Sequence, residues 1–222
     1  MSLSIGIVAE GITDQLVVQN ILLGFFKEKL SEQDIYFDQP PDRSLEEERY
    51  GSWAMVMTYL KQGRHRDVFQ LRDYLVVQID SDVSPLKHFD VSHTDPDTGK
   101  ERSAASLVAA IRQRLGDWIG AADLQRYASR FLFAICVHET ECWLVPLWED
   151  SRHHHATTNC TTRVQRGQRK QKVKQPISKN EPRSYDAASA SYRKRKALET
   201  AAKAQASLGL FLDELRLVST KP

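Results

Sequence analysis

The sequence predicts an α/β protein with a central, mainly parallel sheet flanked by helices. Residues 74–80 and 131–137 are almost wholly apolar and rich in β-branched or aromatic side chains, which is typical of strands that helices cover on both faces. Stretches with apolar residues at helical spacing separate the predicted strands. Helix and strand therefore alternate along the chain, and this order favours a parallel sheet.

The first half of the chain supplies most of this pattern. Residues 3–9 predict a strand, and residues 13–26 a helix with Thr13 or Asp14 as its N-cap. Residues 34–38 predict a short strand. A helical stretch is expected from near Ser44 to Leu60, and a further helix over residues 67–73 leads into the central strand at 74–80.

The second half repeats the pattern once and then changes character. Residues 103–118 predict an amphipathic helix and residues 131–137 a second fully apolar strand. Residues 163–176 are rich in Lys, Arg and Gln and predict a mobile arm. One long helix or two, interrupted at Gly209, are expected over 187–217. We therefore expect a catalytic domain over 1–150, a basic and partly flexible arm over 151–196, and a C-terminal helical part over 197–222.

Composition places the chain among soluble globular proteins, with 41% hydrophobic and 27% charged residues in a length of 222. It has no apolar run of membrane-spanning length and no visible export signal, so we expect a cytoplasmic protein without a membrane partner. The three cysteines Cys136, Cys142 and Cys160 show no Cys-x-x-Cys spacing. This argues for a reducing compartment over a disulfide framework.

Acidic side chains follow each of the three clearest predicted strands. Because the carboxyl ends of parallel strands meet at one edge of a sheet, these side chains are expected to converge. Clustered carboxylates repel one another unless a cation lies between them, and oxygen ligands suit Mg²⁺ or Mn²⁺. The alternative is a set of solvated turns and caps. The candidate metal ligands are Glu10, Asp14, Asp80, Asp82, Glu139 and Glu141.

Two of these groups resemble the Toprim domain, which bacterial primases, type IA and type II topoisomerases, a small ribosomal-RNA maturation ribonuclease and the OLD-family nucleases share. The matching residues are Glu10-Gly11-x-x-Asp14 after the first strand and Asp80-x-Asp82 after a later one. Glu139-Thr-Glu-Cys-Trp-Leu144 and the short Tyr192-x-Lys194 are similar to the Toprim-like proteins related to OLD nucleases. The sequence departs from many Toprim proteins in lacking a Gly soon after Asp82.

The resemblance implies a metal-dependent nuclease that cleaves DNA or RNA with one or two Mg²⁺ or Mn²⁺ ions. Glu10 would be a general base or metal ligand, and Asp80 and Asp82 the metal-binding pair. Asp14 would support the first metal, and Glu139 and Glu141 would complete a second position. Lys194 is a candidate for stabilising charge in the transition state.

The charge of the chain is unevenly distributed. Residues 163–196 hold twelve Lys or Arg against Glu181 and Asp186, while the rest of the chain carries a net charge of −8. Release of counterions from phosphates would favour contact of this segment with nucleic acid, and docking on an acidic protein partner is the alternative. The candidate contacts are Arg163, Arg166, Arg169, Lys170, Lys172, Lys174, Arg193 and Lys196.

Two other functional classes stay open: an unrelated Asp-x-Asp enzyme such as a phosphatase or glycosyltransferase, and a non-catalytic subunit that binds nucleic acid or a partner. The chain contains no Gly-x-x-x-x-Gly-Lys-Ser/Thr motif. Since nucleases related to the OLD group often work with an ATPase, the resemblance implies a separate ATPase subunit and a two-component anti-phage defence system. It also makes a homodimer an expectation.

Overall fold

The structure is a computed structural model that describes residues 3–40 and 52–218. In this part of the chain four strands form one sheet in the order β2-β1-β3-β4. All three neighbouring pairs are parallel. The strands are β1 (Ile5–Val8), β2 (Ile35–Gln39), β3 (Tyr74–Asp80) and β4 (Phe131–Cys136). The predicted α/β class with a parallel sheet is confirmed.

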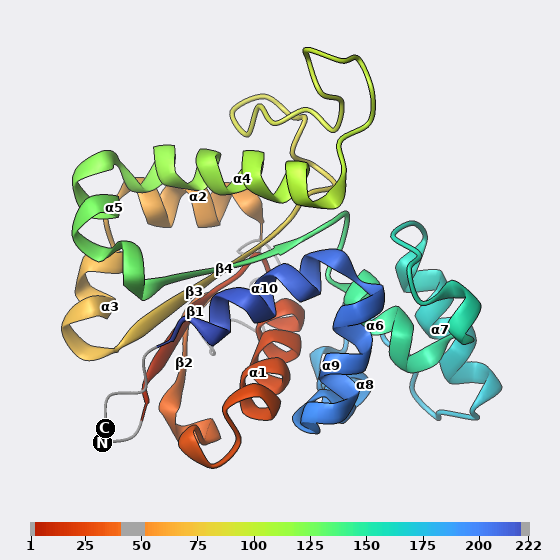
Figure 1. Cartoon of the computed structure of the whole chain (residues 1–222). Helices are drawn as coiled ribbons and strands as arrows, with labels where there is room; N and C mark the ends of the chain where they lie inside the picture. Colours follow the sequence, from red (N-terminus) through yellow and green to blue (C-terminus); the bar gives the residue numbers. More distant parts are fainter. Residues whose placement is uncertain (1–2, 41–51, 219–222) are drawn as a thin grey trace.

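Helices cover both faces of the sheet, so the molecule has three layers (Figure 1). One face packs against α2 (Trp53–Lys61), α3 (His65–Leu71) and α4 (Ala104–Ile119), with α5 (Ala121–Tyr127) beside them. The other face packs against α1 (Ile12–Phe26), α6 (Glu141–Trp148), α8 (Pro182–Ser189), α9 (Arg195–Ala204) and α10 (Ala206–Arg216).

The alternation of side chains along β3 separates an apolar face from one that carries polar groups. Leu75, Val77 and Ile79 are fully buried against α2, α3 and α4. Val76, Gln78 and Asp80 have the opposite parity, and Val76 lies in the core formed with α1. Gln78 and Asp80 therefore point toward the layer that holds α1 and α6.

The outer edge of β4 is covered by α10, which protects it from pairing with another strand. The backbone N–H of Phe133 donates to the Glu214 carboxylate at 2.7 Å, and Arg112 pairs with the same carboxylate. α10 thus blocks the sheet edge with a side-chain acceptor in place of a fifth strand.

Two local expectations are wrong, and a third is not tested. Helix α1 has Gly11 as its N-cap, and Asp14 lies in the first turn. Gly209 lies inside α10, and the break between α9 and α10 falls at Gln205. The expected start of a helix near Ser44 lies outside the described residues, and α2 begins at Trp53.

The expectation of an irregular arm over 163–176 is wrong for its first half, because Cys160–Lys170 forms helix α7. Cys160, Val164, Gly167 and Gln168 are buried at helical spacing and pack α7 against α6. A Cβ atom on Gly167 would come within 1.9 Å of the Trp148 backbone oxygen, so only glycine allows this close approach. One narrow apolar stripe is enough to form a helix that is otherwise polar.

The cysteine spacing argues against a disulfide framework, but the structure contains one disulfide. Cys142, in the first turn of α6, and Cys160, at the start of α7, form a disulfide, while Cys136 is a buried free thiol. None of the described helices is long and apolar enough to cross a membrane.

Candidate metal centre

The carboxyl ends of β1, β3 and β4 meet at one edge of the sheet, as their parallel pairing requires. β4 ends close to the start of α6, below the long 81–103 loop (Figure 1). Acidic side chains from the ends of all three strands and from the start of α1 therefore reach one region. The convergence expected from the sequence occurs, although the six candidates do not all reach it equally.

Gln78 organises the centre of this edge. Its Oε1 accepts from the Glu10 backbone N–H at 3.0 Å, which ties the end of β1 to β3. Its Nε2 lies 2.9 Å from Asp80 Oδ1 and 3.0 Å from Thr140 Oγ1. Thr140 in turn donates to Asp80 Oδ1 at 2.9 Å. Asp80 is thus held by two neutral donors, both of which stabilise its ionised form.

Glu10 turns back over the end of β3. Its Oε1 accepts from the Asp80 backbone N–H at 2.7 Å, and the carboxylate also accepts from the backbone of Trp53 at the start of α2. Burial raises the pKa of Glu10 to about 8, with additions from the charges of Asp14 and Asp82, while the backbone hydrogen bonds act in the opposite direction.

Asp14 and Glu141 are the buried members of the acidic group, and Asp80 is half-buried beside them. Burial raises the pKa of Asp14 to about 7, and the charge of Glu141 adds to this. Burial also raises the pKa of Asp80 well above its usual range, with contributions from Asp14, Glu10 and Glu141. Each group disfavours ionisation of its neighbours, and a bound cation would remove that penalty.

Asp82 lies at the exposed side of this group. The chain turns at Ser81, whose N–H is 3.0 Å from the backbone oxygens of both Cys136 and His138, so strand geometry ends at Asp80. Asp82 is exposed and accepts from the Val83 N–H at 2.8 Å. Since β3 ends at Asp80, the alternation of side chains along a strand does not place Asp82 on the same face as Asp80, although the charge of Asp82 still acts on Glu10.

Glu139 lies at the opposite side and is bound by α7. The backbone N–H of Thr161 donates to Glu139 Oε1 at 3.0 Å, and the Thr161 hydroxyl lies 3.3 Å from both carboxylate oxygens. Glu139 follows His138, which has a left-handed φ of 64°. The left-handed backbone of His138 turns the chain from β4 toward α6.

Four helices begin at this edge, and their N-termini compensate part of its negative charge. Asp14 and Glu141 lie in the first turns of α1 and α6. Glu10 accepts from the first residue of α2, and Glu139 from the second residue of α7. The positive end of a helix dipole and its free N–H groups favour carboxylates at all four places.

Among the described residues, Lys179 is a cation close to the carboxylates, and it is not one of the candidates chosen from the sequence. The negative charges of Glu141, Asp14, Asp80 and Glu139 raise the pKa of Lys179 against the opposing effect of desolvation. Gln165 and Gln168 of α7 hold Ile177, two residues before Lys179: Gln165 Nε2 donates to the Ile177 oxygen, and the Ile177 N–H donates to Gln168 Oε1.

Lys194, the residue proposed for this role from the sequence, is elsewhere. It lies beside Leu23, Lys27 and Leu30, at the end of α1 opposite to Asp14. From Asp14 to Leu23 the helix rises about 13 Å. The structure therefore does not bring Lys194 to the carboxylates, and Lys179 occupies the position expected for it.

The predicted nucleic-acid contacts fall into two separate groups. Arg163, Arg166, Arg169 and Lys170 lie on α7, and Lys172 and Lys174 follow it. Arg166 pairs with Glu149, and Arg163 Nε donates to the Thr158 oxygen at 3.0 Å. Arg193 and Lys196 line a cavity with Lys194 near the end of α1. Of the two groups, only the first belongs to α7, the helix whose Thr161 also donates to Glu139.

The residues fit a hard divalent cation by their chemistry, because several desolvated carboxylates share one region beside the single charge of Lys179. They are not drawn together to ligand spacing. Among the described residues the one group of three ligand atoms lying within 4.8 Å of one another is Glu139, Cys142 and Cys160. That group offers no thiolates while the two sulfurs are bonded to each other.

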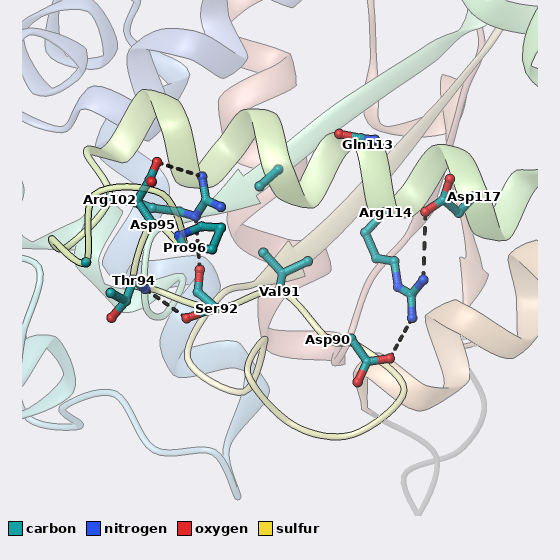
Figure 2. A pocket seen from close by; sticks show the side chains of 12 residues that line it. Asp90, Val91, Ser92, Thr94, Asp95, Pro96, Arg102, Gln113, Arg114 and Asp117 are labelled. Atoms are coloured by element: carbon teal, nitrogen blue, oxygen red, sulfur yellow. Dashed lines mark hydrogen bonds and ion pairs between the residues drawn. The ribbon is translucent and has the colours of Figure 1, made fainter.

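A cavity of about 550 Å³ lies elsewhere, between residues 90–102 and α4 (Figure 2). Its two arginines are already paired, Arg102 with Asp95 at 3.7 Å and Arg114 with Asp90 at 2.8 Å and Asp117 at 3.7 Å. None of the six candidate ligands lines this cavity, so it does not extend the acidic centre.

Sequence reasoning missed the residues that hold the acidic side chains in place: Gln78, Thr140, Thr161, Lys179 and Tyr185. Gln78 gave a signal, because it is a polar residue inside an apolar strand, two residues before Asp80. Thr140 lies between Glu139 and Glu141 but is not itself acidic, and the other three come from segments whose folding the pattern did not indicate. No protein-family model, curated protein or solved structure matches the chain.

Proposed function

We propose that the chain is a divalent-metal-dependent nuclease of Toprim type, which hydrolyses phosphodiester bonds in DNA or RNA. The observation that carries the proposal is the meeting of Glu10, Asp14 and Asp80 at one sheet edge, with pKa values raised by burial and mutual repulsion. Strongly perturbed carboxylates in one place are typical of functional sites.

In this proposal Asp14, Asp80 and Glu141 hold Mg²⁺ or Mn²⁺, with Asp82 and Glu139 at the two sides. When bound, the ion supplies Lewis-acid polarisation of the phosphoryl group and neutralises developing charge. Glu10 is suited to act as a general base near neutral pH, since its pKa is about 8. No covalent side-chain nucleophile is required, because positioning and electrostatics supply most of the catalysis of phosphoryl transfer.

Lys179 is the cation proposed to face the phosphate. It lies within electrostatic reach of four of the carboxylates and is exposed to solvent, so a substrate can reach it. A Lys at this point would offset the negative charge that develops on the non-bridging phosphate oxygens in the transition state.

The proposed substrate contact is the exposed side of α7 and the residues after it. Arg169, Lys170, Lys172 and Lys174 are exposed and, among the described residues, form no ion pair within 4.0 Å. α7 also holds Glu139, so a polyanion on this helix would lie next to the acidic edge. A separate ATPase subunit and a homodimer belong to the same proposal, as parts of a two-component anti-phage system.

The test is a cleavage assay with purified protein on single- and double-stranded DNA and RNA, with Mg²⁺, with Mn²⁺ and with EDTA, and with and without a candidate ATPase. We expect metal-dependent cleavage that Asp80→Ala and Glu10→Ala each reduce by at least about 100-fold. Cleavage that survives in both variants, or binding without cleavage under every metal, would contradict the proposal.

A further inference from the structure

Glu141, the most buried of the candidate ligands, is held by a tyrosine from another part of the chain. The Tyr185 hydroxyl donates to Glu141 Oε1 at 2.5 Å. Tyr185 is fully buried and Glu141 is 3% exposed, so water cannot replace this bond. A short hydrogen bond from a neutral donor to a buried carboxylate is strong and directional.

The position of Tyr185 is itself fixed by α1. Asn20 of α1 donates to Ser189 Oγ at 2.7 Å, and Ser189 Oγ donates to the Tyr185 backbone oxygen at 2.7 Å. Tyr185 is thus held by α1 through its backbone oxygen, while its hydroxyl donates to Glu141.

We propose that Tyr185 is a positioning residue that holds the Glu141 carboxylate beside Asp14 and Asp80 in readiness for a divalent cation. The inference rests on the proposed function, and it gives α8 a part in the metal centre that the domain division expected from the sequence does not include. Carboxylate ligands of metals are commonly oriented in this way by a hydrogen-bond partner, and loss of such a partner weakens metal binding by about 10-fold to 100-fold.

The chain offers a matched control. Tyr192 lies in the short 3₁₀ turn η5 (Ala190–Arg193), is also fully buried, and also donates to α6, but its acceptor is the Trp143 backbone oxygen. Replacing either tyrosine with Phe removes one buried hydroxyl and one hydrogen bond to the same helix. Only Tyr185→Phe removes a bond to a candidate ligand.

The experiment measures Mn²⁺ binding to the full chain by calorimetry and by the loss of the free-ion electron paramagnetic resonance signal. We expect Tyr185→Phe to weaken Mn²⁺ binding about 10-fold and Tyr192→Phe to leave it unchanged. Thermal unfolding of both variants checks that each is folded at the temperature of the binding measurement. Equal affinity in Tyr185→Phe and the unaltered protein, or equal weakening in both variants, would overturn the inference.

A second comparison keeps the inference testable if Tyr185→Phe is poorly folded. In a Glu141→Gln background the orientation of the carboxylate no longer matters, so adding Tyr185→Phe is expected to cause no further loss of Mn²⁺ affinity. A full additional loss in that background would contradict a role through Glu141. If the unaltered protein binds no divalent ion, the proposed function fails; if it binds Mn²⁺ and the tyrosine has no effect, only this inference fails.

Discussion

At the scale of single residues, the acidic edge is a balance between repulsion and neutral hydrogen bonds. Gln78 and Thr140 donate to Asp80, and backbone N–H groups donate to Glu10. These donors keep carboxylates in a desolvated place but do not cancel their charge. The energetic cost of that charge has a measurable consequence for stability.

The stability of the metal-free protein is predicted to fall as pH rises through neutrality. The pKa of Glu10 is raised from 4.5 to about 8 and that of Asp14 from 3.8 to about 7. For each group, at a pH between its unfolded and its folded pKa, the folded state binds more protons than the unfolded chain. The free energy of unfolding therefore decreases as the pH rises through this range. We expect a loss on the order of a few kcal/mol between about pH 5.5 and about pH 8, measured by urea unfolding in EDTA.

The variant Glu10→Gln separates this effect from other titrating groups. It removes one of the raised carboxyls, so the decrease with pH should become smaller. Mg²⁺ should also reduce the decrease in the unaltered protein, because a bound cation favours the ionised carboxylates. A free energy of unfolding that rises over this pH range, with or without Glu10, would contradict the pKa values on which the site rests.

Lys179 and Lys194 provide a second prediction at the same scale. Both are exposed lysines outside helices, but only Lys179 is close to the carboxylates. Lys179→Met is expected to lower the rate of cleavage by about 10-fold to 100-fold through lost stabilisation of charge, while Lys194→Met leaves the rate unchanged. Single-turnover cleavage at saturating protein measures the difference. A larger loss of rate in Lys194→Met than in Lys179→Met would support Lys194, the residue chosen from the sequence, as the one that stabilises the transition state.

The carboxylates were predictable from the sequence and the residues around them were not, for a physical reason. Strand ends are marked by an abrupt change from apolar to acidic residues, and parallel pairing then brings those ends together. Lys179 and Tyr185 reach the same place only because α7 and α8 fold back on α6 and α1. That folding depends on tertiary contacts far apart in the sequence, which local patterns do not encode.

At the scale of elements, α7 shows how a weak pattern can conceal a helix. Its stretch Cys160–Lys170 has few apolar residues, and the predicted arm followed from that composition. The helix is stabilised by contacts with α6 at both ends: the disulfide at its start, and the close approach of Gly167 to Trp148 one turn before its end. α7 carries both the Thr161 donors to Glu139 and the basic side chains. The packing of α7 on α6 therefore determines the position of Glu139 and of the basic side chains.

The disulfide is predicted to stabilise the fold and the position of Glu139. Cys142 and Cys160 are 18 residues apart, and closing a loop of this length stabilises by about 3 kcal/mol through the unfolded chain. Replacing both with Ser should lower the free energy of unfolding by about that amount, measured in urea without reductant. In the variant a reductant should have no further effect.

The thiol count gives the control for this prediction. The denatured protein should show one reactive thiol, that of Cys136, before reduction and three after it. Three thiols in the protein as isolated, with unchanged stability on reduction, would show that the bond between α6 and α7 is not formed.

At the scale of the whole molecule, charge is divided between an acidic sheet edge and a basic segment that packs beside it. Residues 163–196 carry a net charge of +10 and the rest of the chain −8. The sequence predicted this division, but it could not show that the basic residues separate into a group on α7 and a group near the end of α1. Only the α7 group is continuous with the candidate centre.

The two basic groups are therefore predicted to contribute differently to nucleic-acid binding. Each phosphate contact adds about 0.9 to the slope of log affinity against log salt for duplex DNA, and about 0.7 for single strands. Replacing Arg169, Lys172 and Lys174 together with Gln should reduce the magnitude of this slope by about two to three. Fluorescence anisotropy in EDTA, which prevents cleavage, measures it over a range of salt concentrations.

The matched control removes the same number of positive charges from the second group, with Arg193, Lys194 and Lys196 replaced by Gln. Arg193 pairs with Glu32 and Asp186. The three replaced residues all lie near the end of α1 that is away from Asp14. If a polyanion follows α7 toward the acidic edge, this variant keeps the salt slope of the unaltered protein. If both variants lose the same part of the slope, the attraction is a property of net charge alone, and α7 has no special place in guiding a phosphodiester to the carboxylates.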